Sequence, residues 1–168
     1  MAPEPRHAYA APAVQIAIER VTVPSDEVRA LISELEQVLG AEYPAEQRHG
    51  LSLDAIFQPH VQFFVARDET AAVGCGGVAL FGDLAEVKRM YVRPAARGQG
   101  VAEALLEHIE AAVRAAGLVR LCLETGDRQL AAIRVYSRTG FSRCAAFGDY
   151  AAMAPERIAA SVFFEKYL

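Results

Sequence analysis

Residues 87–116 read VKRMYVRPAARGQGVAEALLEHIEAAVRAA, and their pattern predicts three elements in immediate succession. Residues 90–92 are strand formers, and Pro94 cannot donate to a sheet ladder, so it ends the strand. From Val101 onward, apolar residues recur every four positions, which predicts a helix with one buried face that stops at Gly117. The stretch is therefore a strand, a glycine turn and a helix, and the other elements form its frame.

The predicted turn has the features of an anion site. Gly98 and Gly100 permit backbone conformations closed to other residues and let a ligand come close to the main chain. The first turn of a helix leaves N–H groups without partners, and the helix dipole adds about half a positive charge there. Arg97 adds a cation whose planar donors suit phosphate oxygens. For the two glycines alone, a tight connection without a ligand remains the alternative.

Two other phosphate-binding motifs do not fit this turn. A P-loop ends in Gly-Lys-Ser/Thr, whereas this turn ends in Gly-Val-Ala. A dinucleotide fingerprint needs a third glycine three residues after Gly100, where Glu103 stands. What remains is Arg97-x-x-Gly100-x-Ala102, which resembles the acetyl-CoA signature of the GNAT N-acetyltransferases, Gln/Arg-x-x-Gly-x-Gly/Ala. The resemblance implies that main-chain donors hold the pyrophosphate of coenzyme A, and the residues concerned are Arg97, Gly98, Gln99, Gly100, Val101 and Ala102.

A second stretch resembles the same family. Residues 129–141 read Gln-x-x-Ala-x-x-x-Tyr-x-x-x-Gly-Phe, against a family pattern that begins with Asn. Gln129 makes similar hydrogen bonds with a longer reach, so it is a candidate cofactor contact. Two motifs in the family's order imply the GNAT fold over nearly all of residues 14–168. This is an α/β fold with a mixed, mostly antiparallel twisted sheet, a splayed central parallel pair and helices on both faces.

Apolar runs and turn signals divide the rest of the chain into short elements. A first helix begins at Ser25 or Asp26 as N-cap and ends at Gly40. Residues 41–60 are irregular, with room for a short helix at 51–57. Two further helices are predicted, one at 101–116 directly after the glycine turn and one at 129–139 within the second motif. Strands are predicted at residues 14–23, 61–67, 71–81, 84–92, 118–125 and 161–166.

The strand at 84–92 changes parity along its length. Ala85 and Val87 are apolar on one alternation, whereas Met90 and Val92 are apolar on the other. One extra residue near Lys88 or Arg89 would return all four to one face, which is what a β-bulge does. The resemblance implies that the bulge turns main-chain N–H groups toward a thioester carbonyl, which makes cofactor contacts of Met90, Tyr91 and Val92.

The resemblance also supplies catalytic candidates. Glu86 matches a position at which several GNAT enzymes use a Glu to deprotonate the amine, often through water; the alternative is a surface ion pair with Lys88 on the same face. Tyr136 of the second motif is the candidate acid for the leaving thiolate; the alternative is an aromatic anchor on the buried face of its helix. Both alternatives stay open from the sequence.

Candidates for acceptor contacts come from two places. Residues 41–60 correspond to the stretch that lines the acceptor pocket in GNAT-like folds, which nominates Tyr43, Arg48 and His49. Arg89 and Lys88 are candidates for binding a carboxylate on the acceptor. The acceptor itself is expected to be a small amine or an amino-acid-like molecule, with a protein N-terminus or lysine as a further option.

Composition narrows the class of protein. The chain of 168 residues is 53% hydrophobic and 23% charged, which is typical of a globular chain with a sizeable core. A net charge of −4 provides no basic excess for nucleic acid or an anionic membrane, and no apolar run is long enough to span a bilayer. The three cysteines and four histidines lack ligand spacing. We therefore expect reduced thiols, no metal and a cytoplasmic protein.

The resulting prediction is an enzyme that moves the acetyl group of acetyl-CoA to a primary amine by direct attack in a ternary complex. Residues 1–13 are expected to be a loose Ala/Pro-rich tail before a single domain at 14–168. The last strand, with Val162, Phe163 and Phe164, could pair across a homodimer. Two alternatives are a non-catalytic acyl-CoA sensor, which would not need Glu86 or Tyr136, and a nucleotide-phosphate binder of another class.

Overall fold

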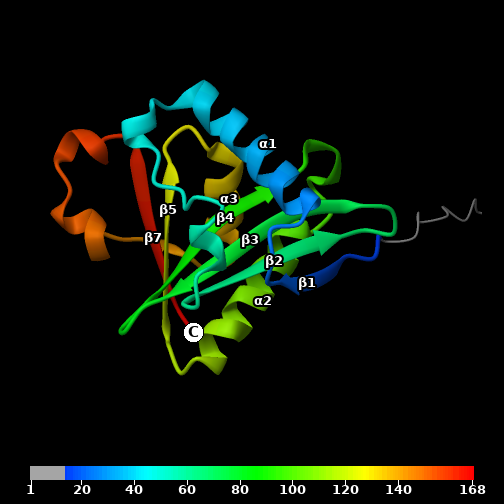
Figure 1. Cartoon of the computed structure of the whole chain (residues 1–168). Helices are drawn as coiled ribbons and strands as arrows, with labels where there is room; N and C mark the ends of the chain where they lie inside the picture. The colour runs from blue at the N-terminus through cyan, green and yellow to red at the C-terminus, as the bar shows by residue number, and fades with distance from the viewer. Residues whose placement is uncertain (1–13) are drawn as a thin grey trace, which may run out of the picture.

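The computed structural model describes residues 14–168, and the tail predicted at 1–13 lies outside them. Within the described residues, seven strands form one sheet in the order β1-β2-β3-β4-β5-β7-β6, and only β4 and β5 are parallel (Figure 1). The mixed, mostly antiparallel sheet is therefore confirmed. The strands are β1 (Ala17–Val21), β2 (Val61–Arg67), β3 (Ala72–Leu80), β4 (Ala85–Val92), β5 (Arg120–Gly126), β6 (Ser142–Arg143) and β7 (Ser161–Tyr167).

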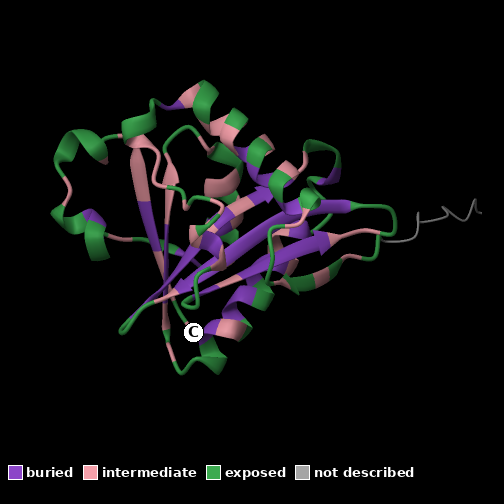
Figure 2. Cartoon of the chain, in the orientation of Figure 1, coloured by how far each residue is buried: buried purple, intermediate pink, exposed green. Residues whose placement is uncertain are grey.

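Helices cover both faces of the sheet, as expected. On one face, α2 (Val101–Ala115) and α3 (Leu130–Arg138) share an apolar core with the sheet. On the other face, α1 (Asp26–Glu42) packs on a second core (Figure 1). The central strands are buried along most of their length (Figure 2). Burial along nearly its whole length explains why β3 carries no polar side chain.

The first helix begins where predicted but ends later. Ser25 is the N-cap, and its Oγ accepts a hydrogen bond from the Val28 amide at 3.3 Å. Gly40 does not end the helix, which runs on to Glu42, so that part of the prediction was wrong. The end is set by Pro44, because a residue before proline is pushed out of the helical region, and Tyr43 is extended at φ −131° and ψ 137°.

The parity change in β4 is a bulge, as predicted. Across from it, Cys75 pairs with Tyr91 and Gly77 pairs with Lys88, so two residues of β4 face the single Gly76 of β3. The extra residue is Arg89, and at φ 57° it is the only non-glycine residue with positive φ in the described part of the chain. An L-residue in this conformation is strained by about 1–2 kcal/mol.

The parallel strands β4 and β5 pair only at their beginnings. Ala85, Glu86 and Val87 are opposite Leu121, Cys122 and Leu123, and no pairing continues beyond them. From Lys88 and Glu124 onward the two strands part. The splayed central pair is therefore confirmed, and it opens a gap through the middle of the sheet.

Residues 144–160 were not assigned to any element by the sequence pattern. They form two 3₁₀ turns, Gly148–Ala152 and Pro155–Arg157, beyond the short β6. Phe147 and Tyr150 from this segment pack with Phe163 on the α1 side of the sheet. The segment brings the Tyr150 hydroxyl to Glu86 and Lys88 of β4.

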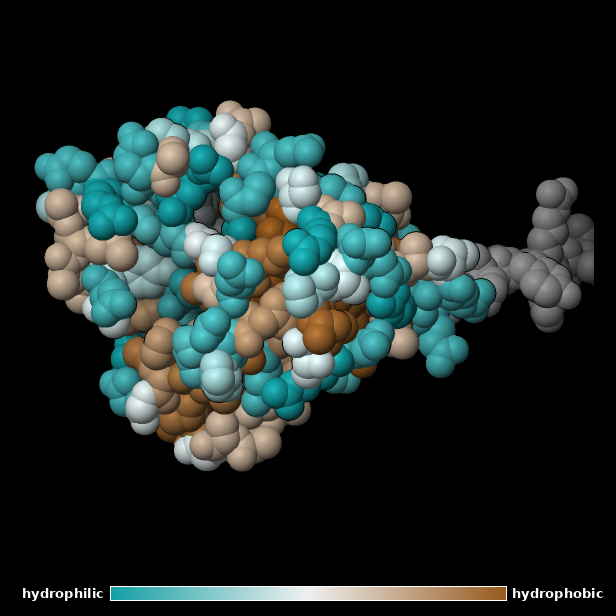
Figure 3. Space-filling view, in the orientation of Figure 1, coloured by the Kyte–Doolittle hydropathy of each residue, from teal (hydrophilic) through white to brown (hydrophobic). Residues whose placement is uncertain are grey.

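The surface is mixed rather than dominated by one kind of side chain. In Figure 3, hydrophobic patches near the middle and at the lower left of the view are bordered by hydrophilic side chains. Within residues 14–168, no helix is both long and apolar enough to cross a membrane. The homodimer stays a prediction, and β6 already occupies part of the outer edge of β7, opposite Phe164 and Glu165.

Candidate active site

The glycine turn ahead of α2 has the geometry of an anion site. Gly98 and Gly100 have positive φ of 76° and 81°, and Gly100 is the N-cap, so no side chain caps the helix. The turn is exposed from Arg97 to Gly100. Arg97 is held by an Nε hydrogen bond to the Val92 carbonyl at 3.1 Å, which fixes its guanidinium beside the turn. The arrangement offers main-chain donors, a helix dipole and a cation to one ligand.

A cavity of about 120 Å³ lies where β4 and β5 part. Its walls come from both faces of the sheet: Tyr136 and Val87 belong to the α2–α3 core, and Leu35 belongs to the α1 core. The cavity therefore passes through the sheet. It brings together the predicted catalytic and acceptor-contact residues and two of the predicted cofactor contacts, namely Tyr43, Arg48, His49, Glu86, Lys88, Arg89, Met90, Gln129 and Tyr136.

Glu86 is buried and lies in a hydrogen-bonded group. Its Oε1 is 2.6 Å from the Lys88 ammonium and accepts a hydrogen bond from the Tyr150 hydroxyl at 2.7 Å. Lys88 also donates to that hydroxyl at 2.7 Å. The pairing with Lys88 is thus as the sequence suggested, but it is buried and not at the surface. No residue among 14–168 donates to Glu86 Oε2. This oxygen is therefore free to accept a proton, or a hydrogen bond from a water molecule.

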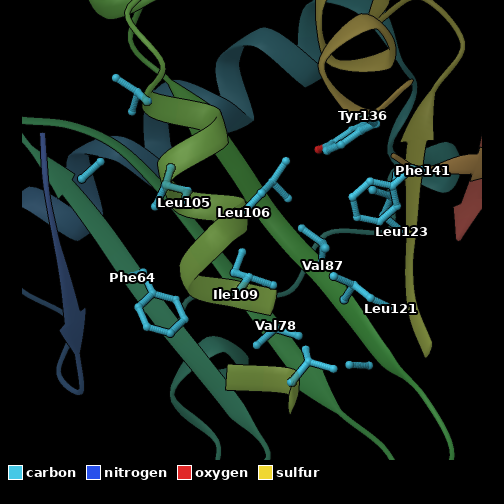
Figure 4. Close-up of a cluster of buried hydrophobic side chains, with 14 of the residues drawn as sticks. Phe64, Val78, Val87, Leu105, Leu106, Ile109, Leu121, Leu123, Tyr136 and Phe141 are labelled. Atoms are coloured by element: carbon cyan, nitrogen blue, oxygen red, sulfur yellow. The ribbon is translucent and has the colours of Figure 1, made fainter. Parts of the chain in front are cut away.

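Tyr136 is buried on α3 with its hydroxyl at the cavity. Its ring packs edge-on against Phe141, and the hydroxyl points away from that ring (Figure 4). The hydroxyl makes no hydrogen bond to residues 14–168. Burial, with a smaller contribution from the charge of Glu124, raises the pKa of Tyr136 well above its usual value. The side chain is therefore both an aromatic anchor and a protonated donor facing an open space.

Tyr43 has a structural role that the sequence did not reveal. Its hydroxyl accepts a hydrogen bond from the Arg128 amide at 2.7 Å and donates to Asp127 at 3.4 Å, so it braces the turn from β5 into α3. Gly126 is required at this contact, because a Cβ there would lie 2.3 Å from the Tyr43 hydroxyl. Gln129 begins α3 and donates to the Glu42 carboxylate, so both ends of this turn are tied to the end of α1.

Two predicted acceptor contacts, Arg48 and Arg89, meet at one carboxylate. Arg48 Nη1 donates to Glu36 Oε2 at 3.1 Å, and Arg89 Nη2 donates to Glu36 Oε1. Another predicted acceptor contact, His49, is 2.9 Å from the Arg157 carbonyl and lies edge-on to Tyr150. The loop after α1 is thereby joined to the segment at 144–160.

A second cavity of about 470 Å³ adjoins the first. The two share a wall made of Arg48, His49, Gly50, Glu86 and Lys88. Aromatic side chains line its far part, namely Phe81, Phe147 and Tyr150. The second cavity has about four times the volume of the first, so it offers more room for the body of a bound molecule.

Three residues of the candidate site were missed by sequence reasoning. Tyr150, Glu36 and Glu124 all contact or line the cavity walls, yet none lies in a motif. Burial raises the pKa of Glu124 despite a hydrogen bond from Ser161, and this favours its neutral form. Tyr150 comes from 64 residues beyond Glu86, and no sequence signal in residues 144–160 marks it.

The cysteines take no part in the cavity. Cys75 and Cys122 are fully buried, and burial raises the pKa of each thiol to about 12. Neither they nor Cys144 line either cavity. In the described part of the chain, no three side chains of His, Cys, Asp or Glu come together as metal ligands.

Comparison with known proteins identifies the family. The profile of the acetyltransferase (GNAT) domain matches residues 59–143. The chain is 43% identical over 155 residues to an IAA acetyltransferase from Azospirillum brasilense, covering 91% of this chain and 98% of that protein. A structure from Klebsiella pneumoniae assigned as an acyl-CoA N-acyltransferase is 35% identical with a TM-score of 0.75, covering 91% of this chain and 97% of that one.

A more distant structure shares the fold. The PaiA N-acetyltransferase from Thermoplasma acidophilum, solved in complex with coenzyme A, is 16% identical with a TM-score of 0.67, and the match covers 90% of this chain and 99% of that one. The family profile and the two closer likenesses make the chain an acyltransferase. It belongs to the GNAT family of acetyltransferases.

Proposed function

We propose that the enzyme transfers the acetyl group of acetyl-CoA directly to a primary amine while both are bound. The observation that carries this proposal is the cavity through the sheet. The glycine turn ahead of α2 and Tyr136 belong to the α2–α3 face, whereas Glu86 belongs to the α1 face. Acetyl-CoA would thus enter from one face and the amine from the other, so that they meet at the gap. Holding two reactants in this way accounts for a large part of catalysis.

The proposal assigns a group to each chemical step. Glu86, through its free Oε2, takes the proton from the amine, directly or through water. The bulge at Arg89 and Met90 frees main-chain N–H groups from the ladder, and these stabilise the thioester oxygen as charge develops on it. Tyr136 donates its proton to the departing sulfur. The pyrophosphate is held by the turn that includes Arg97, Gly98 and Gly100.

The state of the cysteines supports direct attack over a covalent intermediate. A thiol whose pKa is raised to about 12 is almost entirely protonated at neutral pH, and so it is a poor nucleophile. Cys75 and Cys122 are also closed off from the cavity. The non-catalytic sensor has no comparable support, because it leaves the buried arrangement of Glu86 and Tyr136 without a role.

An acetylation assay tests the proposal. The protein is incubated with acetyl-CoA and a panel of primary amines, and release of free coenzyme A is compared with the mass of each amine. We expect at least one amine to gain an acetyl group at a rate proportional to enzyme, with no acetylated enzyme detected by mass spectrometry. Coenzyme A binding without any acetylated amine would favour the sensor instead.

The glycine turn ahead of α2 gives a separate prediction. Gly100→Ala should raise the KM for acetyl-CoA by about tenfold or more, because the added Cβ resists the positive φ that aims the first amides of α2 at the ligand. The measurement is initial velocity against acetyl-CoA concentration. Gly117 is a matched control, since it ends the same helix at φ 76° with nothing near its Cβ position.

Both variants should lose a similar stability, about 1 kcal/mol, through backbone strain. Only Gly100→Ala should lose affinity for acetyl-CoA. If Gly117→Ala raised the KM equally, strain alone would explain the effect, and the turn would not be the pyrophosphate site.

A further inference from the structure

The α1 side of the cavity carries an incompletely neutralised pair of arginines. Arg48 and Arg89 share the single carboxylate of Glu36, and each uses one guanidinium nitrogen to do so. Two positive charges thus face one negative charge. Lys88 does not change this balance, because its ammonium is already paired with Glu86. The cluster is left with one uncompensated positive charge at the cavity wall.

Both guanidiniums also hold donors that the protein does not use. Nε of Arg48 and Nε of Arg89 are buried and have no hydrogen-bond partner among residues 14–168. Arg89 as a whole is only 8% exposed. Buried donors are nearly always satisfied in native proteins, so two unsatisfied ones in side chains that line a cavity point to a missing acceptor.

The chain adopts unusual local structure to place Arg89 there. Arg89 is the strained residue of the β4 bulge, at φ 57°. Opposite it, Gly50 leaves room for the guanidinium, because a Cβ at this position would lie 2.1 Å from Arg89 Nη1. Strain of this kind is maintained at functional sites, where the surrounding structure holds it in place.

We propose, on the basis of the proposed function, that the acetyl acceptor is an amine that also carries a carboxylate, which Arg48 and Arg89 bind. A guanidinium offers planar paired donors that match the two oxygens of a carboxylate. One carboxylate supplies one negative charge, which is what the cluster lacks, whereas a phosphate would overcompensate it. Glu86 lies three residues before Arg89 on β4, so a molecule held by its carboxylate presents its amine along the strand toward the base.

The adjoining cavity has room for such a molecule. Its volume of about 470 Å³ and its shared wall with Arg48 and Glu86 allow the rest of an amino acid to extend away from the gap. The aromatic part of that wall, with Phe147 and Tyr150, favours an apolar body over a second charge.

The experiment compares matched acceptors that differ only at the anionic group. Amino acids, both α and ω, are compared with their carboxamides and with phosphoethanolamine at saturating acetyl-CoA, over a range of pH that covers each amine's titration. We expect kcat/KM to favour the carboxylate over its amide by about tenfold or more, as lost hydrogen bonds to charged groups imply. Arg48→Gln, and independently Arg89→Gln, should remove most of this preference.

Arg93→Gln is the control variant. Arg93 also joins the end of β4 to α1 through an arginine–glutamate pair, with Glu34 at 2.8 Å, but it lines neither cavity. It should keep the preference for the carboxylate, and thermal melting checks that all three variants fold. Equal use of acid and amide by the unmodified enzyme, or preference for phosphoethanolamine, would overturn this inference and leave acetyl transfer intact. If no amine were acetylated at all, the proposed function would fail with it.

Discussion

Tyr136→Phe is expected to lower kcat by about a hundredfold, the lower range for a positioned acid or base. The KM for acetyl-CoA should change by no more than about threefold, because the ring remains and only the donor is lost. Stability should change by less than about 1 kcal/mol, since the hydroxyl has no partner among residues 14–168 to lose. Steady-state kinetics and thermal melting on the same preparation give all three quantities.

The raised pKa of Tyr136 is compatible with its role as an acid. A thiol titrates near 8.5 in water, so a phenol with a raised pKa would not readily protonate a solvated thiolate. In a dry site the balance shifts, because desolvation also makes a thiolate more basic. This protein provides its own examples, since burial raises the pKa of Cys75 and Cys122 to about 12.

Tyr43→Phe separates catalysis from support. Tyr43 lines the same cavity, but its hydroxyl bonds the Arg128 amide. Its loss should cost about 1 kcal/mol of stability and lower kcat by much less than Tyr136→Phe does. If the two variants had the same kinetic effect, or if Tyr136→Phe kept its full kcat, the assignment of Tyr136 as the acid would be wrong.

Glu86→Gln should lower kcat by about a hundredfold at neutral pH. Glutamine keeps the size and an oxygen for Lys88 and Tyr150, but it cannot take a proton from the amine. The difference in kcat between the two enzymes should shrink as the pH rises toward the pKa of the acceptor amine. At that pH the amine loses its proton to solvent, and Glu86 is no longer needed to remove it. A full pH–rate profile of both enzymes measures this.

Glu110→Gln is the matched control. Glu110 is also buried and paired with a lysine, Lys166 at 2.6 Å, but it lies on α2 away from both cavities. Each substitution leaves a partly buried lysine without its partner's charge and should cost stability, up to about 3 kcal/mol. Only Glu86→Gln should slow turnover. A deficit that was equal at every pH would mean that Glu86 supports the structure and does not act as a base.

Local signals were sufficient for the part of the site that we propose to bind the cofactor. The positive-φ glycines, the uncapped start of α2 and the bulge in β4 each follow from residue types within a few positions of one another. The bulge was readable because period-2 alternation fails when one residue is inserted. The buried strands were found from their apolar runs, which need no partner to be recognised.

The acceptor side could not be read in the same way. Its groups meet only through tertiary structure: Tyr150 reaches Glu86 across 64 residues, and Glu36 reaches Arg89 across 53. Tyr150 lies in a segment without periodicity. Glu36 lies on α1, where the sequence shows it only as one of several charged residues. The end of α1 was misjudged for a related reason, because Gly40 is a signal for a helix end that Pro44 and the capping amide of Tyr43 override.

The most direct test of the account is a calorimetric titration of the protein with acetyl-CoA, repeated in the presence of excess ATP. If the start of α2 and the gap between β4 and β5 hold an acyl-CoA, one molecule should bind per chain, the melting temperature should rise with ligand, and ATP should not displace it. An absence of heat and of any thermal shift with acetyl-CoA, or displacement by ATP at comparable concentration, would contradict the account.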